Sequence, residues 1–211
     1  MNPRDPDAEL LARVARADAS AVRQFVARKL PRLLALAVRM LGDRMEAEDV
    51  AQETFVRIWK QAPHWREGEA RVDTWLHRVA MNLCYDRLRV RREVPDDTLD
   101  ETQPDDAGQG PITPEAALEA RQQGARVRQA LAALPPRQRE ALVLTYYQAL
   151  SNAEAAGLMG LTVDALESLL VRARRSLRAQ LSEAAAAKPA PQGRPRARGR
   201  EAEPTPAARK R

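Results

Sequence analysis

The sequence predicts an all-α protein in which two small helical domains are joined by an acidic, flexible linker. Ala, Leu, Arg and Glu dominate the composition and aromatic residues make up only 4%, which favours helix over sheet. Apolar residues recur at helical spacing on both sides of the middle of the chain. Between these blocks, residues 93–114 hold seven acidic residues, four Pro and no basic residue, and such a segment cannot bury a core. We therefore divide the chain into a first domain, the linker, a second domain and a disordered Ala/Pro/Arg tail, at 1–94, 95–114, 115–181 and 182–211.

The first domain is predicted to be a run of helices separated by short breaks. Apolar side chains recur every three or four residues from Leu10 to Phe25. We expect Pro31 to kink or restart the helix that contains it, because its ring clashes with the preceding turn. Gly42–Asp43 is predicted to end that helix in a turn. Two further helices are expected, at 47–61 and at about 72–91.

The second domain carries explicit helix-start signals. A Pro pair at 135–136 suits the first turn of a helix, where a missing N–H costs nothing. Ser151 and Glu154 form a capping box, and Gly160 followed by Thr162 indicates a stop and a second N-cap. Two short helices joined by a tight turn are the layout of a helix-turn-helix. A packed pair of Ala/Leu-rich helices without a DNA role would give the same pattern.

The positive charge of the chain has to be judged locally. The net charge is +6, but residues 182–211 contain eight Lys or Arg against three Glu, so the tail contributes +5 and the other 181 residues only +1. Whole-chain basicity is therefore mostly a property of the tail, and nucleic-acid binding must be argued from clusters.

One cluster lies at 62–92, where aromatic residues stand beside arginines. Such a combination suits single-stranded nucleic acid, because bases stack on rings and guanidinium groups hold phosphates. Its candidate residues are His64, Trp65 and Arg66 in a loop, Arg78, Asn82 and Asp86 on one helical stripe, and Arg87, Arg89, Arg91 and Arg92 at the far end. The alternative is that Trp65 and Trp75 are core residues and Asn82 an ordinary surface amide.

Two further surfaces are candidates for binding. Asp49, Gln52 and Glu53 lie on the side of the 47–61 helix that faces away from its apolar residues, and this face is either solvated or a docking surface for a basic partner helix. In the second domain the row Arg172, Arg174, Arg175 and Arg178 can hold phosphates. The helix that carries this row begins with Asp164 and Glu167 instead of basic residues, so it should bind DNA poorly alone.

Catalytic and metal-binding readings find no support in the sequence. The single cysteine, Cys84, allows no intrachain disulfide and no cysteine-built metal site. His64 and His77 lack partners at ligand spacing, and no nucleophile motif is present. We expect no cofactor, no metal and no enzyme activity. The N-terminus has no apolar signal core and no stretch approaches a membrane span, so we expect a cytoplasmic protein without membrane insertion.

Three separated motifs resemble the sigma-70 family of bacterial RNA polymerase specificity factors, and most closely its extracytoplasmic-function (ECF) group. "LGDRMEAEDVAQETFVRIWK" and "RVDTWLHRVAMNLCYDRLRVRR" are similar to the two parts of region 2, and "LPPRQREALVLTYYQALSNAEAAGLMGLTVDALESLLVRARRSLR" is similar to region 4. Together they cover most of residues 7–181 in the family's order and spacing. The resemblance implies that the first domain is region 2 and the second is region 4.

The resemblance also implies a role for each candidate residue. Asp49, Gln52 and Glu53 match the family's DxxQE, which contacts the β′ clamp helices of core polymerase, and the β flap is a further expected partner. The loop and helix residues of the 62–92 cluster match positions that open and read the promoter −10 element. The −35 element would be read by Thr162, Asp164, Ala165, Glu167, Ser168, Arg172, Arg174 and Arg175. The family's usual Phe-Arg-Gly-Glu is Trp-Arg-Glu-Gly-Glu here, and "LESLL" stands where many relatives have a more basic run.

Partners and alternatives follow from the same comparison. The implied partners are core polymerase, promoter DNA and an anti-sigma factor, and the protein would meet the nucleoid through polymerase. A conventional helix-turn-helix regulator that acts without polymerase is the main alternative, against which stand the first domain and the weakly charged recognition-helix tip. A helical scaffold that binds protein alone is the third possibility, and it would tolerate loss of Arg172 and Arg175.

Overall fold

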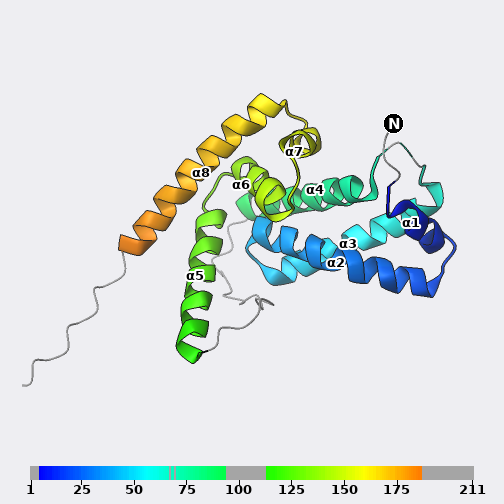
Figure 1. Cartoon of the computed structure of the whole chain (residues 1–211), viewed down its shortest axis with the longest axis horizontal. Helices are drawn as coiled ribbons and strands as arrows, with labels where there is room; N and C mark the ends of the chain where they lie inside the picture. Colours follow the sequence, from blue (N-terminus) through cyan, green and yellow to red (C-terminus); the bar gives the residue numbers. More distant parts are fainter. Residues whose placement is uncertain (1–4, 67, 69, 94–112, 187–211) are drawn as a thin grey trace, which may run out of the picture.

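The computed structural model describes residues 5–66, 68, 70–93 and 113–186 (Figure 1). All regular secondary structure in these residues is helical, which confirms the predicted all-α class. The expected linker, apart from its last two residues, and the basic tail beyond Ala186 lie outside the described residues.

The first domain is built around one long central helix, α2, on which the other helices pack. Its core is formed by large apolar side chains, and Phe25 of α2 meets Phe55 of α3 edge to face, with ring centroids 6.2 Å apart. The helix continues through Pro31 without a break, so the predicted restart at this residue is wrong. The elements are α1 (Ala8–Ala15), α2 (Ala19–Leu41), α3 (Arg44–Gln61), the 3-10 turn η1 (Ala62–His64) and α4 (Val72–Glu93).

The turn between α2 and α3 has the predicted chemistry. Gly42 ends α2 in the left-handed conformation, with φ of 76°, where a side chain would be strained. Asp43 then caps α3 by accepting a hydrogen bond from the backbone N–H of Glu46 at 3.0 Å.

A buried charge network ties the N-terminal segment to the start of α4. The Lys29 ammonium is buried and donates to Asp7 at 2.5 Å and to Asp73 at 2.6 Å. Asp5 accepts from the backbone N–H of Val72 at 2.6 Å and so caps α4 across 67 residues of sequence. Burial raises the pKa of Asp7, but the hydrogen bonds from Lys29 and Arg28 outweigh it and hold that pKa below its ordinary value.

The second domain ends in a helix-turn-helix that is formed by its last two helices. The capping box of Ser151 and Glu154 is present at the start of α7, and Gly160 ends this helix with φ of 64°, as predicted. The last helix is 24 residues long and not short as predicted, and Figure 1 shows it extending from the body of the molecule. The elements are α5 (Pro114–Ala132), α6 (Pro136–Leu142), the π-helical turn η2 (Val143–Tyr147), α7 (Asn152–Met159) and α8 (Val163–Ala186).

The two domains are in contact. The second domain packs on α2 through α5, α6 and η2, and its α7 lies beside α4 (Figure 1). The guanidinium of Arg139 on α6 donates to the carbonyl oxygen of Met40, near the end of α2. The sequence analysis joined the domains by a linker and made no prediction about contact between them.

Candidate polymerase and nucleic-acid surfaces

The outer face of α3 carries the candidate docking residues. Asp49 and Gln52 are exposed, and Glu53 is half-buried and receives a hydrogen bond from Arg57 at 2.8 Å. Met45 and Trp59 stand seven positions to either side of Gln52 and are 68% and 40% exposed. The face is thus polar at its centre with an exposed apolar side chain at each end. The sequence analysis missed these two residues. Each is seven positions, or about two helical turns, from Gln52 and so lies on the same side of the helix, which the sequence alone could have shown.

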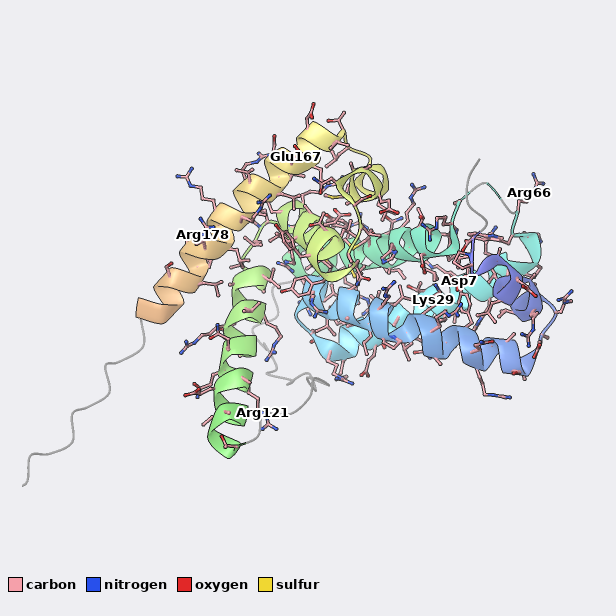
Figure 2. The ribbon with its side chains drawn as sticks, in the orientation of Figure 1. Asp7, Lys29, Arg66, Arg121, Glu167 and Arg178 are labelled. Carbon is pink, nitrogen blue, oxygen red and sulfur yellow. The ribbon has the colours of Figure 1, made fainter. Side chains whose placement is uncertain are left out.

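The predicted loop residues divide between packing and exposure. Trp65 is half-buried and packs edge to face on Trp75, with ring centroids 6.3 Å apart. Both rings are partly buried against the core, which agrees in part with the alternative that they are core residues. His64 and Arg66 are exposed. Figure 2 shows Arg66 at the opposite end of the molecule from Arg178 of α8.

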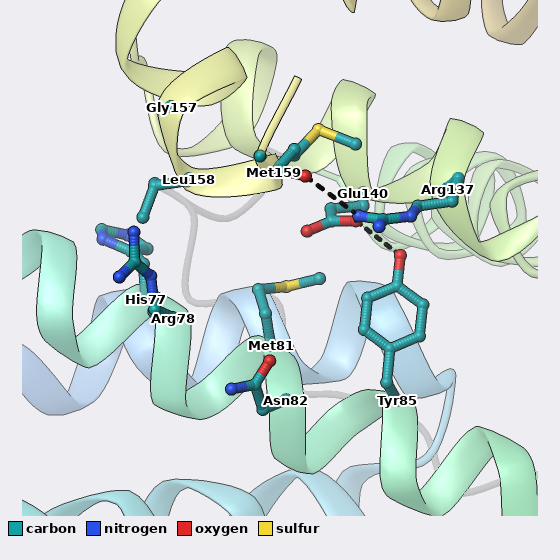
Figure 3. Close-up of a pocket in the computed structure, with 11 residues that line it drawn as sticks. His77, Arg78, Met81, Asn82, Tyr85, Arg137, Glu140, Gly157, Leu158 and Met159 are labelled. Carbon is teal, nitrogen blue, oxygen red and sulfur yellow. Dashed lines mark hydrogen bonds and ion pairs between the residues drawn. The ribbon is translucent and has the colours of Figure 1, made fainter.

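The predicted stripe on α4 faces the second domain. Arg78 and Asn82 are exposed and line a cavity of about 440 Å³ whose opposite wall includes Leu158 and Met159 of α7 (Figure 3). Asp86, one turn further on, is exposed and lies 3.3 Å from Arg89. An amide and a guanidinium side by side can each hydrogen-bond a base edge.

The arginines at the far end of α4 differ in their surroundings. Arg91 donates to Glu46 and to the carbonyl oxygen of Leu41, at 3.0 and 2.9 Å, and thereby joins α4 to the turn between α2 and α3. Arg87 lies 3.4 Å from Asp49, so one predicted DNA contact is paired with one predicted polymerase contact. Arg92 is exposed.

The start of α8 presents the candidate recognition residues. The hydroxyl of Thr162 accepts from the backbone N–H of Ala165 at 3.2 Å, as the predicted N-cap should. Asp164 is exposed in the first turn, where a carboxylate is favoured by the helix dipole. Glu167 accepts from the amide of Asn152 on α7 at 3.1 Å, which links the two helices of the helix-turn-helix. Ala165 is half-buried and Ser168 exposed.

The arginine row of α8 projects from a helix that is buried on its other side. Leu166, Leu170 and Ala173 face the domain core. Arg172 and Arg174 are exposed and donate through Nε to backbone carbonyls of their own helix, both at 3.2 Å. Among the described residues neither these two nor Arg175 or Arg178 pairs with a carboxylate. These cations therefore remain available to phosphates.

Two other titratable side chains, Cys84 and His77, are buried in the interior of the molecule. Cys84 is fully buried, and burial raises the pKa of its thiol to about 12. His77 is buried and its ring nitrogens lie beside oxygens of Asp73 and Gln148. Within the described parts of the chain, no group of His, Cys, Asp and Glu is arranged to hold a metal ion. None of the described helices is both long and apolar enough to cross a membrane.

Comparison with known proteins places both halves of the chain in one family. Residues 25–94 match the model of Sigma-70 region 2, and residues 124–177 match that of Sigma-70, region 4. The chain is 32% identical over 183 residues to the RNA polymerase sigma-H factor of Pseudomonas aeruginosa, covering 84% of this chain and 94% of that factor. It is 31% identical over 160 residues to the ECF RNA polymerase sigma factor SigE of Mycolicibacterium smegmatis, covering 76% of this chain and 61% of SigE.

A solved structure extends the likeness to the fold. The structure of CnrH in complex with the cytosolic domain of CnrY matches with a TM-score of 0.62 and 32% identity, over 85% of this chain and 99% of CnrH. The chain therefore belongs to the sigma-70 family, in the ECF group of transcription initiation factors that direct RNA polymerase to specific promoters.

Proposed function

We propose that three surfaces divide the work of promoter recognition in this protein: α3 docks on core polymerase, α4 opens and reads the −10 element, and α8 reads the −35 element. The observation that carries the proposal is that most of the residues matching the family's motifs lie in or next to these helices, on faces directed away from their own domain cores. A rigid helix holds its exposed side chains in a constant arrangement, which recognition of a partner requires.

Docking would use the outer face of α3. Asp49 and Glu53 supply negative charge and Gln52 an amide, while Met45 and Trp59 add apolar area at the two ends. A half-exposed Trp is well suited to an interface, because a large ring loses little conformational entropy on binding. The partner surface that fits is a pair of helices with basic and apolar residues, such as the β′ clamp helices. The β flap is the proposed support for the second domain.

Reading of the −10 element would use α4 and the preceding loop. Opening a duplex exposes single bases, and each unstacked base has to be held by stacking and by hydrogen bonds to its edges. Arg78 and Asn82 offer such hydrogen bonds from adjacent turns, and Arg66 and Arg92 are exposed cations that can hold the backbone.

Reading of the −35 element would use α8 as a helix that polymerase delivers. The tip carries Asp164 and Glu167, so attraction to phosphates comes from the arginines beyond Ser168. Tethering through α3 raises the local concentration of α8 at DNA, and weak intrinsic affinity then suffices. A carboxylate at the tip can also accept from cytosine N4.

The remaining assignments follow from the same role. The protein would act in the cytoplasm as a non-catalytic factor, with the polymerase performing the chemistry. CnrH was solved with the cytosolic domain of CnrY, and RpoE of Bartonella quintana with the anti-sigma factor NepR; we propose that this chain also binds an anti-sigma factor.

The decisive experiment mixes the purified chain with sigma-free core polymerase and selects promoter fragments for open-complex formation. We expect specific fragments to melt when both proteins are present and not when either is omitted. Gln52→Ala combined with Trp59→Ala should abolish binding to core, whereas Lys60→Ala, also exposed on α3, should leave it unchanged. Selection of duplex DNA without polymerase would instead identify a conventional regulator.

A further inference from the structure

Both ends of the loop that is proposed to handle −10 bases are anchored on the N-terminal segment of the chain. The loop begins in the 3-10 turn η1, which carries His64, and it ends at Val72, the first residue of α4. Helix α1 packs on η1, and its side chains Leu10 and Leu11 are buried. The residues directly before α1 reach the start of α4. One segment of the chain thus fixes both the entry and the exit of the loop.

The exit of the loop is fixed by the carboxylate of Asp5. One of its oxygens accepts from the backbone N–H of Val72 at 2.6 Å, and the other accepts from that of Asp7 at 3.0 Å. The caps of α2 and α3 come from the residue directly before each helix. Arg71 precedes α4, and its side chain can only donate, so it cannot accept from the N–H groups of the first turn. Asp5 supplies the acceptor from a distant part of the sequence, at the end of the helix where negative charge is favoured.

A buried ammonium group makes the same connection a second time. Lys29 of α2 donates to Asp7 at 2.5 Å and to Asp73, in the first turn of α4, at 2.6 Å. Arg28 is a further donor to Asp7, at 2.9 Å. Figure 2 shows Asp7 and Lys29 side by side, with Arg66 beyond them toward the same end of the domain. A buried ion pair that loses one partner is strongly destabilised, so these contacts hold the start of α4 and the segment before α1 in one arrangement.

The side chains of the loop depend on where α4 begins. Trp65 packs edge to face on Trp75, which lies in the first turn of α4. His64 and Arg66 flank Trp65 in the sequence and are exposed. A base that leaves the stack has to meet its stacking and hydrogen-bonding groups within about 0.5 Å of the productive geometry. A shift in the start of α4 would therefore misplace the side chains of the loop together.

We propose that Asp5, Asp7 and Lys29 are positioning residues for recognition of the −10 element, because they hold the loop and the start of α4 in the arrangement that receives unstacked bases. Asp7 and Lys29 are buried and act without touching DNA. The proposal rests on the assignment of the −10 surface to this loop and to α4. It differs from a contribution to stability alone, because it predicts a loss of selectivity among −10 bases and not merely a loss of folded protein.

The test uses the full chain with core polymerase and a promoter obtained by selection. Each −10 base pair is changed in turn, and the apparent equilibrium constant of open-complex formation is divided by that of the unchanged promoter. This selectivity does not depend on the fraction of protein that is folded. Asp5→Ala removes both hydrogen bonds that the carboxylate accepts. We expect it to lower −10 selectivity roughly tenfold, the contribution of one well-placed hydrogen-bonding side chain, and to leave −35 selectivity and core binding unchanged.

Asp18→Ala is the matched control. The carboxylate of Asp18 also accepts from two backbone N–H groups, those of Ser20 and Ala21 at 2.8 and 3.2 Å, but it caps α2 and not α4. This variant should be destabilised and yet keep the −10 selectivity of the parent. Asp5→Asn retains one acceptor oxygen and should fall between the parent and Asp5→Ala. Asp73→Asn weakens the ion pair with Lys29 from the side of α4, should lower −10 selectivity in the same direction, and carries the test if Asp5→Ala does not fold.

A variant of the loop itself, His64→Ala with Arg66→Ala, separates the two proposals. If it alters −10 selectivity while folded Asp5→Ala and Asp73→Asn do not, the positioning role is overturned and the assignment of the loop stands. If Asp18→Ala lowers −10 selectivity as much as Asp5→Ala, the effect is one of general stability and the positioning role is again overturned. If the loop variant leaves −10 selectivity unchanged, the assignment of the loop is wrong and the positioning role falls with it.

Discussion

One row of arginines lies at the C-terminal end of α4 and another along α8. The two rows look alike in the sequence, but their partners in the structure differ. In α4, Arg91 is bound to Glu46 and to the carbonyl oxygen of Leu41, and Arg87 lies beside Asp49. In α8, Arg172 and Arg174 contact only backbone carbonyls of their own helix among the described residues, and no carboxylate lies within ion-pair distance.

The difference follows from what packs beside each helix. The end of α4 lies against the acidic start of α3, so its cations meet carboxylates that are already held in place. One side of α8 packs on the small domain core, and among the described residues none of its arginines forms an ion pair with a carboxylate. A cation with a fixed partner contributes to stability, and one without a partner remains available to DNA, so an arginine count does not measure nucleic-acid affinity.

The largest expected effect concerns Lys29, the most deeply paired cation of the first domain. Asp7→Ala leaves its buried ammonium with Asp73 as its one remaining carboxylate, and we expect a loss of about 3 kcal/mol in the free energy of unfolding, as for a broken buried pair. Because the folded pKa of Asp7 is lowered, its contribution is fully present above about pH 4 and is lost as pH falls through the folded value. Urea unfolding at neutral pH and at pH 3 measures both; equal losses at the two pH values would contradict the linkage.

Removal of the unpaired row should affect DNA and not stability. Arg172→Ala with Arg175→Ala is expected to weaken promoter binding by the holoenzyme about tenfold to a hundredfold and to lower the salt slope of binding by about 2. Thermal unfolding should be unchanged, because neither guanidinium pairs with a carboxylate among the residues that the structure describes. Filter binding at several salt concentrations tests this prediction, with Arg121→Ala, at an exposed position of α5, as the control. A lowered melting temperature of the double variant would show that Arg172 and Arg175 stabilise the fold, as Arg91 is expected to do.

Removal of Arg91 should have the opposite result. Arg91→Ala leaves Glu46 and the Leu41 carbonyl without this donor, and we expect about 1–2 kcal/mol of destabilisation. Arg92→Ala, at the next and exposed position, should cost nothing measurable. Denaturant unfolding distinguishes the two variants. A DNA-binding defect in a fully stable Arg91→Ala variant would show that Arg91 contacts DNA, as is proposed for the arginines of α8.

The smallest expected effect is the coupling between Arg87 and Asp49. The pair is 3.4 Å long and substantially exposed, so a double-mutant cycle in stability should give less than about 1 kcal/mol. If the pair restrains Arg87 from binding DNA, Asp49→Asn should strengthen binding of single-stranded DNA by the free chain slightly. A variant that also lacks Arg87 is the matching control, and in it Asp49→Asn should not change the binding of single-stranded DNA.

Local features of the fold were predictable from the sequence. The Gly42 stop, the Ser151–Glu154 capping box, the Thr162 cap and the helix-turn-helix all depend on residues within one turn of each other. The predicted restart at Pro31 does not occur, because packing of α2 on α1, α3 and α4 outweighs the loss of one backbone hydrogen bond. The π-helical turn at Val143–Tyr147 carries no local signal that the analysis could use.

The candidate site divides in the same way. Motif spacing was sufficient to select Asp49, Gln52 and the arginines of α8, and the structure places all of them on exposed faces. Spacing could not reveal that Arg91 is bound to Glu46, 45 residues away, or that Tyr85 meets Glu140 across 55 residues. Such partners are brought together by the packing of helices.

The sequence by itself determined the all-α class, the capped starts and glycine stops of several helices, and the family, because capping, periodicity and motif order depend on neighbouring residues. The tertiary structure alone decided which cations are paired, which face of α4 is covered and how the two domains meet. Those outcomes depend on contacts between residues far apart in the chain, where the favourable energy of a buried polar pair exists only after the helices have packed.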